Sequence, residues 1–421
     1  MLNKSSFDAV RTSVFGTQSR RPLPDTYSFA GLPALVRHVL TGDGPLGLPE
    51  EVLAGLPRRY DRVALLFLDA FGWAQAERVL DRSPLLQRIA AEGVISVLTS
   101  QFPSTTTAHI TSLLYAQPVG QHGLYEWCVY EPAFDRLIVP LLYNFADDEV
   151  PNTLPVDPAQ LAPGVPLFQT LNERGVRSVA ALNRQWYGLR TLQASTVGAA
   201  PLPSASLTDG LDRLADAMEA DAGPLLAWLY HEGIDGTSHH FGPDAPETAA
   251  EVEQTLRLIE ERLVRRLAVK GDGRTLVLIF ADHGQIGVDP EQTLYVNELV
   301  PEIEGLVRRG AGDRPLAPAG SPRDLFLHIQ PGRVEEAVAL LSAHPALAGL
   351  MDVFTVRELA DAGLFGATGE RFWQRVGDVV VLPVEGQNVW WREKYRVPAN
   401  RGDHGGLSPQ EMEIPLLALA L

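Results

Sequence analysis

The sequence contains a single cysteine, Cys128, among its 421 residues. An internal disulfide is therefore excluded, and the composition favours a reducing compartment, so we expect a cytoplasmic protein. The N-terminal residues 1–24 hold no apolar segment typical of a signal peptide. No apolar run reaches the roughly 18 residues that a membrane span requires, and we expect no membrane association.

Basic residues are also scarce, with 35 Lys and Arg against 52 Asp and Glu, which gives a net charge of −17. A chain this acidic repels nucleic-acid backbones and anionic membranes, so we expect no nucleic-acid partner. Phosphate chemistry would need locally concentrated positive charge, which bound metal ions can provide. The sequence gives no indication of an oligomeric state.

Apolar runs alternate along the chain with amphipathic helical segments. Because the runs are apolar throughout, they indicate strands that are buried on both faces of a sheet. This alternation predicts an α/β fold with a mostly parallel sheet. The predicted strands are 62–71, 94–100, 176–182, 224–235 and 275–284.

The regular alternation stops within residues 301–375, which we interpret as a small α+β cap insertion. We therefore predict a core whose first part is 1–300 and whose last part is 376–421. Within it, residues 1–60 are expected to form an irregular lead-in. The main sheet is expected to resume at GDVVVLP (377–383).

The stretch FPSTTTAHIT (102–111) holds four consecutive hydroxyl residues before an apolar helix. One interpretation is a helix N-cap, for which Ser and Thr are favoured. The other is a nucleophile at a helix N-terminus, where free N–H groups face an anion. The stretch alone leaves both open.

Potential metal ligands follow three of the predicted strands, at the sheet edge where ligands of α/β proteins gather. Carboxylates and neutral imidazoles form the mixed ligand set that zinc or manganese accepts, and enough of them occur for two ions. Two-metal sites stabilise the attacking and leaving oxygens of phosphoryl transfer. The candidates are Asp69, Asp235, His239, Asp282 and His283, with His404 in a late His-Gly-Gly motif.

The order of these motifs resembles the alkaline phosphatase superfamily, most of all its type I phosphodiesterase/nucleotide pyrophosphatase branch. Asp69 is followed by Pro-Ser-Thr-Thr, Asp-x-x-x-His-x-x-Gly-Pro, Asp-His-Gly and His-Gly-Gly. The resemblance implies a three-layer α/β/α sandwich with the cap insertion. It also implies a two-metal phosphoric ester hydrolase with zinc, or alternatively manganese, that acts on a small phosphate ester such as a nucleotide.

The resemblance assigns roles to individual residues. Thr106 would be the nucleophile and would form a phosphothreonine, while its neighbouring hydroxyls cap the helix. One metal would be held by Asp235, His239 and His404. The other would be held by Asp69, Asp282 and His283, with Thr106 as a further ligand. The branch carries an Asn three residues after the nucleophile, for contact with a phosphoryl oxygen; here that place is His109, which could donate instead or simply pack.

Several alternatives remain open on sequence grounds. Either neighbour, Thr105 or Thr107, could replace Thr106 as the nucleophile, and Asp403 could orient a ligand or form a turn. A phosphomonoesterase or a phosphonate hydrolase could use the same scaffold, and so could a non-catalytic metal-binding protein. A sulfatase is disfavoured, because the Cys/Ser-x-Pro-x-Arg motif does not occur.

Overall fold

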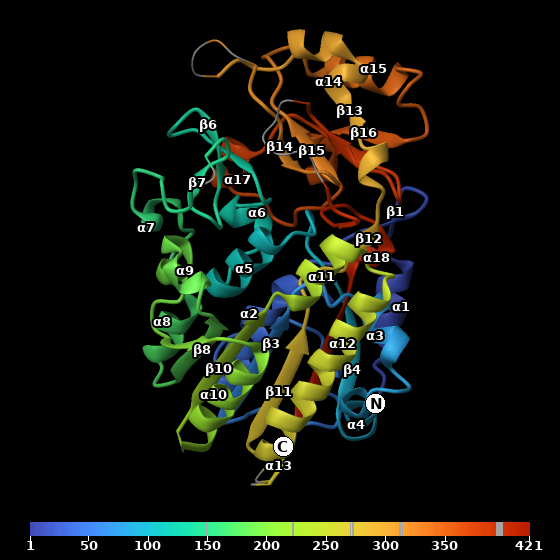
Figure 1. Ribbon diagram of the computed structural model, residues 1–421. Coiled ribbons are helices and arrows are strands. Elements are labelled where there is room, and N and C mark those ends of the chain that lie inside the picture. The colour runs from blue at the N-terminus through green and yellow to red at the C-terminus, as the bar shows by residue number, and fades with distance from the viewer. Residues whose placement is uncertain are drawn as a thin grey trace.

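A seven-stranded sheet with strand order β4-β20-β11-β3-β10-β8-β9 forms the centre of the protein in the computed structural model (Figure 1). The structure describes residues 1–148, 150–220, 223–269, 271, 273–310, 313, 315–392 and 399–421. All neighbouring strands of this sheet are parallel except β20, which runs antiparallel to both β11 and β4. The strands are β3 (Arg62–Leu68), β4 (Val94–Thr99), β8 (Arg177–Asn183), β9 (Ala200–Ser204), β10 (Leu225–His231), β11 (Thr275–Phe280) and β20 (Glu413–Ala420).

The apolar runs form the central strands because both faces of the sheet are covered. Every residue of β3 and of β11 is buried. In the middle of the sheet, Leu65 pairs with Trp228 of β10 on one side and with Leu278 of β11 on the other. This arrangement confirms the predicted mostly parallel α/β sheet.

Helices cover both faces of the sheet. α10 (Leu207–Ala220) and α12 (Pro246–Ile259) lie on one face, and α2 (Leu32–Thr41) and α8 (Leu167–Asn172) lie on the other (Figure 1). In the described part of the chain, none of the helices has both the length and the apolar character needed to cross a bilayer.

Local sequence signals explain several of the helix boundaries. The predicted helix at 83–93 is α4 (Pro84–Glu92), where the Ser83 hydroxyl accepts a hydrogen bond from the Leu86 N–H and Gly93 follows the last residue. Residues 1–60 were expected to form an irregular lead-in with a few short helical patterns. The short helices are present, but the segment is more than a lead-in, because α1 (Lys4–Thr12) packs against β4 and α2 belongs to the main core.

A smaller antiparallel sheet, of order β14-β15-β17-β16, lies above the carboxyl edge of the main sheet (Figure 1). Its strands are β14 (Ala319–Ser321), β15 (Asp324–Leu327), β16 (Met351–Thr355) and β17 (Val379–Pro383), and they surround a second hydrophobic core. The expectation that 377–383 returns to the main sheet was wrong. β17 pairs with β15 and β16, and the returning strand is β20. Both segments are apolar runs, so their periodicity could not distinguish the two sheets.

Candidate active site

The topology brings three acidic residues to one edge of the main sheet. β3 lies between β11 and β10, and all three strands run in the same direction. Asp69 directly follows β3, Asp282 follows β11, and Asp235 lies in the first turn of α11 (Gly233–Phe241), just after β10. The carboxyl ends of adjacent parallel strands meet at the same edge, so these side chains converge as predicted.

Asp69, Asp282 and His283 form a fully buried ligand group next to Thr106. One ligand atom from each of the three lies within 4.8 Å of the others. The Thr106 hydroxyl lies 3.2 Å from Nε2 of His283 and 3.3 Å from Oδ2 of Asp69. Among the described residues, Oδ2 of Asp282 is buried without a hydrogen-bond partner. A buried carboxylate oxygen without a donor is costly unless a cation satisfies it, so this group fits a metal ion.

Asp235, His283 and His404 form a second group, again with ligand atoms within 4.8 Å of one another. His239 adjoins this group through Asp235, whose Oδ1 lies 3.3 Å from its Nε2. The side chains of Asp235, His239 and His404 are 18%, 24% and 12% exposed, whereas Asp282 and His283 are fully buried. Asp235, His239 and His404 therefore lie on the solvent side of the site, whereas His283, which both groups share, is buried.

His239, His283 and His404 each direct Nε2 toward the site, because Nδ1 of each ring is hydrogen-bonded to a backbone carbonyl. Nδ1 of His239 donates to the Gly402 carbonyl, Nδ1 of His283 to the Gly284 carbonyl and Nδ1 of His404 to the Ser104 carbonyl. A hydrogen bond at Nδ1 fixes the tautomer in which Nε2 carries the lone pair. His283 and His404, whose pKa values burial lowers, are thus prepared to bind a cation through Nε2. Burial opposes the charged form of His239 as well, but the Asp235 carboxylate raises the pKa of His239 to about 9, so a cation at its Nε2 would replace a proton.

The electrostatics of the protein without a cation favour cation binding. Burial raises the pKa of Asp69 well above its usual value, and the charges of Asp282 and Asp235 raise it further. Burial raises the pKa of Asp282 to about 7. Burial also lowers the pKa of His283, which holds its ring neutral. A bound divalent ion would offset both the cost of burying these carboxylates and the repulsion between them.

Two supporting residues orient these ligands. The hydroxyl of Tyr230 donates to Oδ2 of Asp69, and Nε2 of Gln285 donates to Oδ1 of Asp235 over 2.6 Å. The Asp403 carboxylate accepts hydrogen bonds from Asn388 and Asn400, and Oδ1 lies 3.5 Å from Nδ1 of His239, so an orienting role of Asp403 stays a prediction. Sequence reasoning missed Tyr230 because its partner is 161 positions away. Gln285 could have been suspected, because it directly follows Asp-His-Gly.

The backbone beside Asp69 is strained. Ala70 has a φ of 58°, in the left-handed region that residues with a Cβ rarely adopt, and its N–H donates to Oδ1 of Asp282 over 3.2 Å. Gly284 has no room for a side chain, because a Cβ there would lie 2.1 Å from the Gln410 carbonyl oxygen. The same Cβ would lie 3.1 Å from Cα of Gly72, so the Ala70 hydrogen bond and the small size of Gly284 both keep the loops after β3 and β11 close together.

The four consecutive hydroxyl residues lead into α5 (Thr106–Tyr115), and Thr105 is the N-cap residue. The neighbours of Thr106 were expected to cap the helix, and that expectation was wrong. Thr105 makes no side-chain cap, and the Ser104 hydroxyl donates to the Gly406 carbonyl. Among the described residues, no side chain caps the start of α5, an arrangement that suits an anion at its first N–H groups.

His109 was a candidate donor to a phosphoryl oxygen, and the structure does not support that role. Its ring is fully buried, Nδ1 lies 2.7 Å from the Thr105 carbonyl oxygen, and Nε2 accepts a 2.9 Å hydrogen bond from the Gln101 N–H. The Ser100 hydroxyl lies 2.9 Å from Nε2 and also donates to the Asp282 carbonyl. Through these hydrogen bonds, His109 links the end of β4 to the start of α5. The structure therefore favours the alternative in which His109 packs in the core.

Replacement of His109 tests this structural link between β4 and α5. We expect His109→Ala to lower the free energy of unfolding by about 2–3 kcal/mol, because the buried Gln101 N–H loses its acceptor. We also expect kcat to fall about tenfold with little change in KM, because Thr106 is held less firmly. Denaturant unfolding and steady-state kinetics measure both. His240→Ala, at an exposed position, is the matched control; equal effects of the two variants would contradict the assignment.

The remaining histidine candidates lie away from the ligand groups. His240 is exposed and its ring contacts Phe241. His122 is buried, with Nε2 3.0 Å from the Ser112 hydroxyl and Nδ1 accepting from the Leu124 N–H. These hydrogen bonds give His122 a structural role at the end of α6 (Val119–His122).

Comparisons with known proteins agree with this geometry. The family model described as type I phosphodiesterase/nucleotide pyrophosphatase matches residues 63–407. Murine ectonucleotide pyrophosphatase/phosphodiesterase 5 superimposes with a TM-score of 0.64 at 17% identity, over 85% of this chain and 87% of that chain. An inactive variant of the murine protein in complex with AMP gives 0.63 at 18% with the same coverage. The human protein gives 0.60 at 16%, again over 85% and 87%. A search of curated proteins finds no match.

The chain therefore belongs to the type I phosphodiesterase/nucleotide pyrophosphatase family, within the alkaline phosphatase superfamily. It is a hydrolase of the phosphodiesterase/nucleotide pyrophosphatase type. The predictions of family, of α/β fold class and of enzyme class are confirmed. The division into 1–300, 301–375 and 376–421 stays a prediction except at 377–383, which pairs within the smaller sheet. The zinc and the cytoplasmic location also stay predictions.

Proposed function

We propose that the protein hydrolyses a phosphodiester bond in two steps, with Thr106 as the nucleophile. The position of the Thr106 hydroxyl carries the proposal. It stands 3.2 Å from His283 and 3.3 Å from Asp69, two members of the buried ligand group, at the start of α5. A hydroxyl placed within a ligand set is in position for activation by a cation.

The ligand set suits two zinc ions. Asp69, Asp282 and His283 would hold the inner ion together with Thr106, and Asp235, His239 and His404 would hold the outer one. The carboxylates and the three Nε2 atoms are the donors that zinc prefers, and manganese is the alternative. When bound, the two cations would supply the positive charge that lowers the pKa of the Thr106 hydroxyl and neutralises the phosphoryl oxygens.

The residues of the chain define the remaining steps. The Thr106 oxygen forms a bond to phosphorus, the bond from phosphorus to the leaving alcohol breaks, and the alcohol takes up a proton. The free N–H groups at the start of α5 donate to the phosphoryl oxygens during this exchange. Water then attacks the phosphothreonine ester, and Thr106 regains its hydroxyl while a phosphomonoester leaves.

A nucleotide is the substrate class that we favour within this chemistry. The family model includes nucleotide pyrophosphatases, and the inactive variant of the murine relative is described in complex with AMP. The identities of 16–18% to the solved relatives show the fold alone, so the substrate rests on the family.

Relative rates on aryl esters test the proposal. With zinc, we expect bis(p-nitrophenyl) phosphate to be hydrolysed faster than p-nitrophenyl phosphate, and p-nitrophenyl sulfate not to be hydrolysed. A preference for the monoester would favour a phosphomonoesterase. Stoichiometric zinc without turnover of any ester would favour a metal-binding protein.

A further inference from the structure

The loop that carries His404 is held by hydrogen bonds to three other segments of the chain. Two buried glycines, Gly405 and Gly406, follow His404 directly. The Gly406 N–H donates to Oε1 of Glu411 over 2.9 Å, and Oγ of Ser321, in the smaller sheet, lies 3.3 Å from the His404 carbonyl oxygen. Gly405 has a φ of 127°, and a Cβ there would lie 2.5 Å from Oγ of Ser321. The loop is therefore closely packed and has little freedom to move.

Ser104 makes the largest share of the hydrogen bonds to this loop. Its N–H donates to the Gly405 carbonyl over 3.2 Å, and its own carbonyl oxygen lies 2.9 Å from Nδ1 of His404. Its hydroxyl donates to the Gly406 carbonyl over 2.8 Å and accepts from the Gly405 N–H over 3.1 Å. Ser104 is fully buried, so loss of its hydroxyl would leave two polar groups of the loop without a partner and shielded from water.

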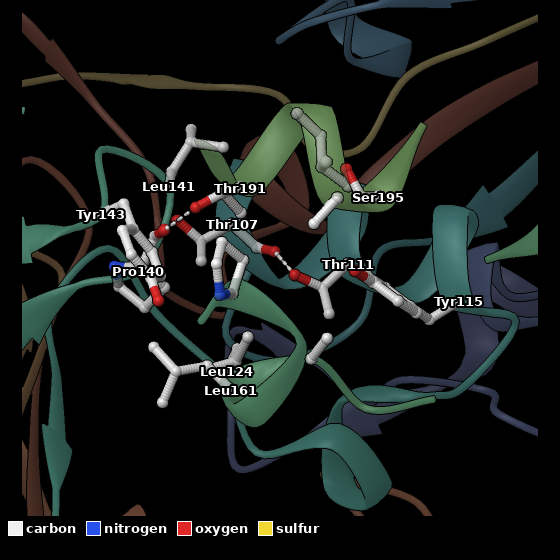
Figure 2. A pocket seen from close by; sticks show the side chains of 14 residues that line it. Thr107, Thr111, Tyr115, Leu124, Pro140, Leu141, Tyr143, Leu161, Thr191 and Ser195 are labelled. Atoms are coloured by element: carbon white, nitrogen blue, oxygen red, sulfur yellow. Dashed lines mark hydrogen bonds between the residues drawn. The ribbon is translucent and has the colours of Figure 1, made fainter. Parts of the chain in front are cut away.

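Ser104 also belongs to the segment that leads to the nucleophile, because it precedes Thr106 by two residues. Ser104 contacts the loop of His404, and Thr106 contacts the inner ligand group. Thr107, in contrast, lines a pocket between α5, α7 (Pro158–Leu161) and α9 (Arg190–Ser195) (Figure 2). The link from this segment to the metal ligands is therefore made by Ser104 and Thr106.

We propose that Ser104 is a positioning residue for the outer cation. Its hydroxyl fixes the loop of His404, and the chain joins it to Thr106, so the outer cation and the nucleophilic hydroxyl take a defined position relative to each other. The inference rests on the proposed function, because it assigns a role within the two-metal site. Replacement of a residue that orients a metal ligand typically changes metal affinity by about 10- to 100-fold.

The two cations should depend on Ser104 to different degrees. Asp69 and Asp282 of the inner group directly follow β3 and β11, two neighbouring strands of the main sheet. His404 instead lies in a loop, and the Ser104 hydroxyl bonds to the two glycines that follow it. Loss of this hydroxyl should therefore weaken the outer site and leave the inner site unchanged.

Zinc titration of Ser104→Ala tests the proposal. Competition with a chromogenic chelator should resolve two zinc-binding steps in the wild type, and the step that His404→Ala weakens is the outer one. Ser104→Ala should weaken this step about 10- to 100-fold and leave the other step unchanged. Equal weakening of both steps, or of neither, would overturn the proposal.

Ser112→Ala is the matched control, because it removes another buried serine hydroxyl close to the nucleophile. Ser112 lies in α5, and its hydroxyl accepts a 2.8 Å hydrogen bond from Nε2 of Gln101. Both serine variants should lower the melting temperature of the zinc-free protein, whereas only Ser104→Ala should change a zinc affinity. A change of zinc affinity as large in Ser112→Ala would show a general loss of structure and would count against the proposal.

A double-mutant cycle shows whether Ser104 acts through His404. In a His404→Ala background, Ser104→Ala should change the outer zinc affinity less than about twofold, because the ligand that Ser104 positions is gone. A full effect in that background would contradict the proposal. If Ser104→Ala does not fold, Ser104→Cys takes its place; it has nearly the same size but a weak donor, and should weaken the outer step in the same direction.

The zinc affinities separate this inference from the proposed function, because the titrations need no substrate. If no ester were hydrolysed, the proposed function would fail while the affinities still decided the role of Ser104. A wild-type protein that binds a single zinc ion would overturn the inference. In the active enzyme, the kcat of Ser104→Ala should fall at low zinc and recover in excess zinc, whereas that of Ser112→Ala should follow the zinc dependence of the wild type.

Discussion

Thr106→Ala should lower kcat for bis(p-nitrophenyl) phosphate by about 10³- to 10⁶-fold, the range seen when a covalent nucleophile is removed. The reason is geometric, because Thr106 carries the hydroxyl that lies among the buried ligand atoms, 3.2 Å from Nε2 of His283. Stopped assays with high enzyme concentration measure the residual rate. Thr106→Ser, which keeps the hydroxyl, should recover a measurable part of the activity.

Two controls make this result specific to the nucleophile. Thr196→Ala removes a hydroxyl that donates to the Leu192 carbonyl outside the site, and should retain full activity. Acid-quenched wild-type enzyme should carry a phosphoryl ester on the peptide with Thr106, detectable by mass spectrometry, and Thr106→Ala should not. A Thr106→Ala enzyme with more than a tenth of the normal rate would refute the assignment and direct attention to Thr107.

Removal of divalent metal should abolish turnover, with a loss of about 10³-fold or more. Burial, together with repulsion from Asp235, raises the pKa values of Asp69 and Asp282, so protons compete with the cation for these carboxyls. Without a bound cation, the hydroxyl of Thr106 has no activating partner. Dialysis against a chelator, followed by kinetics and elemental analysis, tests this. Zinc added back should restore the rate.

Removal of the metal by dialysis against a chelator should also lower the melting temperature, because ligands that bind only the folded state stabilise it by mass action. Asp282→Asn removes one charge from the inner ligand group and should reduce both zinc content and the response of the melting temperature to zinc. Glu302→Gln, at an exposed position, is the matched loss of one charge and should change neither. Full activity in metal-free protein would disprove the two-metal proposal.

Much of the site could be predicted from the sequence because the carboxyl ends of adjacent parallel strands lie at the same edge of the sheet. Asp69, Asp235 and Asp282 each follow a continuous apolar run, and the structure places β3, β10 and β11 side by side. His404 needed the motif order, since a short pairing between β12 (Ile286–Gly287) and β19 (Gly402–Asp403) brings its loop to the site.

Other features depend on tertiary contacts that no local pattern encodes. The His109 position suggested a side chain turned toward the site, but the carbonyl of Thr105 and the N–H of Gln101 hold its ring in the core. The apolar run at 377–383 satisfies either sheet equally well, and only the pairing with β15 and β16 decides between them. The hydrogen bond from Tyr230 to Asp69 joins two neighbouring strands whose order in the sheet the sequence does not state.

The position of β20 has a consequence for shortened forms of the chain. It is the last strand in sequence and yet occupies an interior place, between β4, which leads to the nucleophile, and β11, which leads to Asp282 and His283. Residues 413–420 are therefore needed to hold the end of β4 and the end of β11 at their final separation. We expect a chain truncated before residue 413 to be inactive.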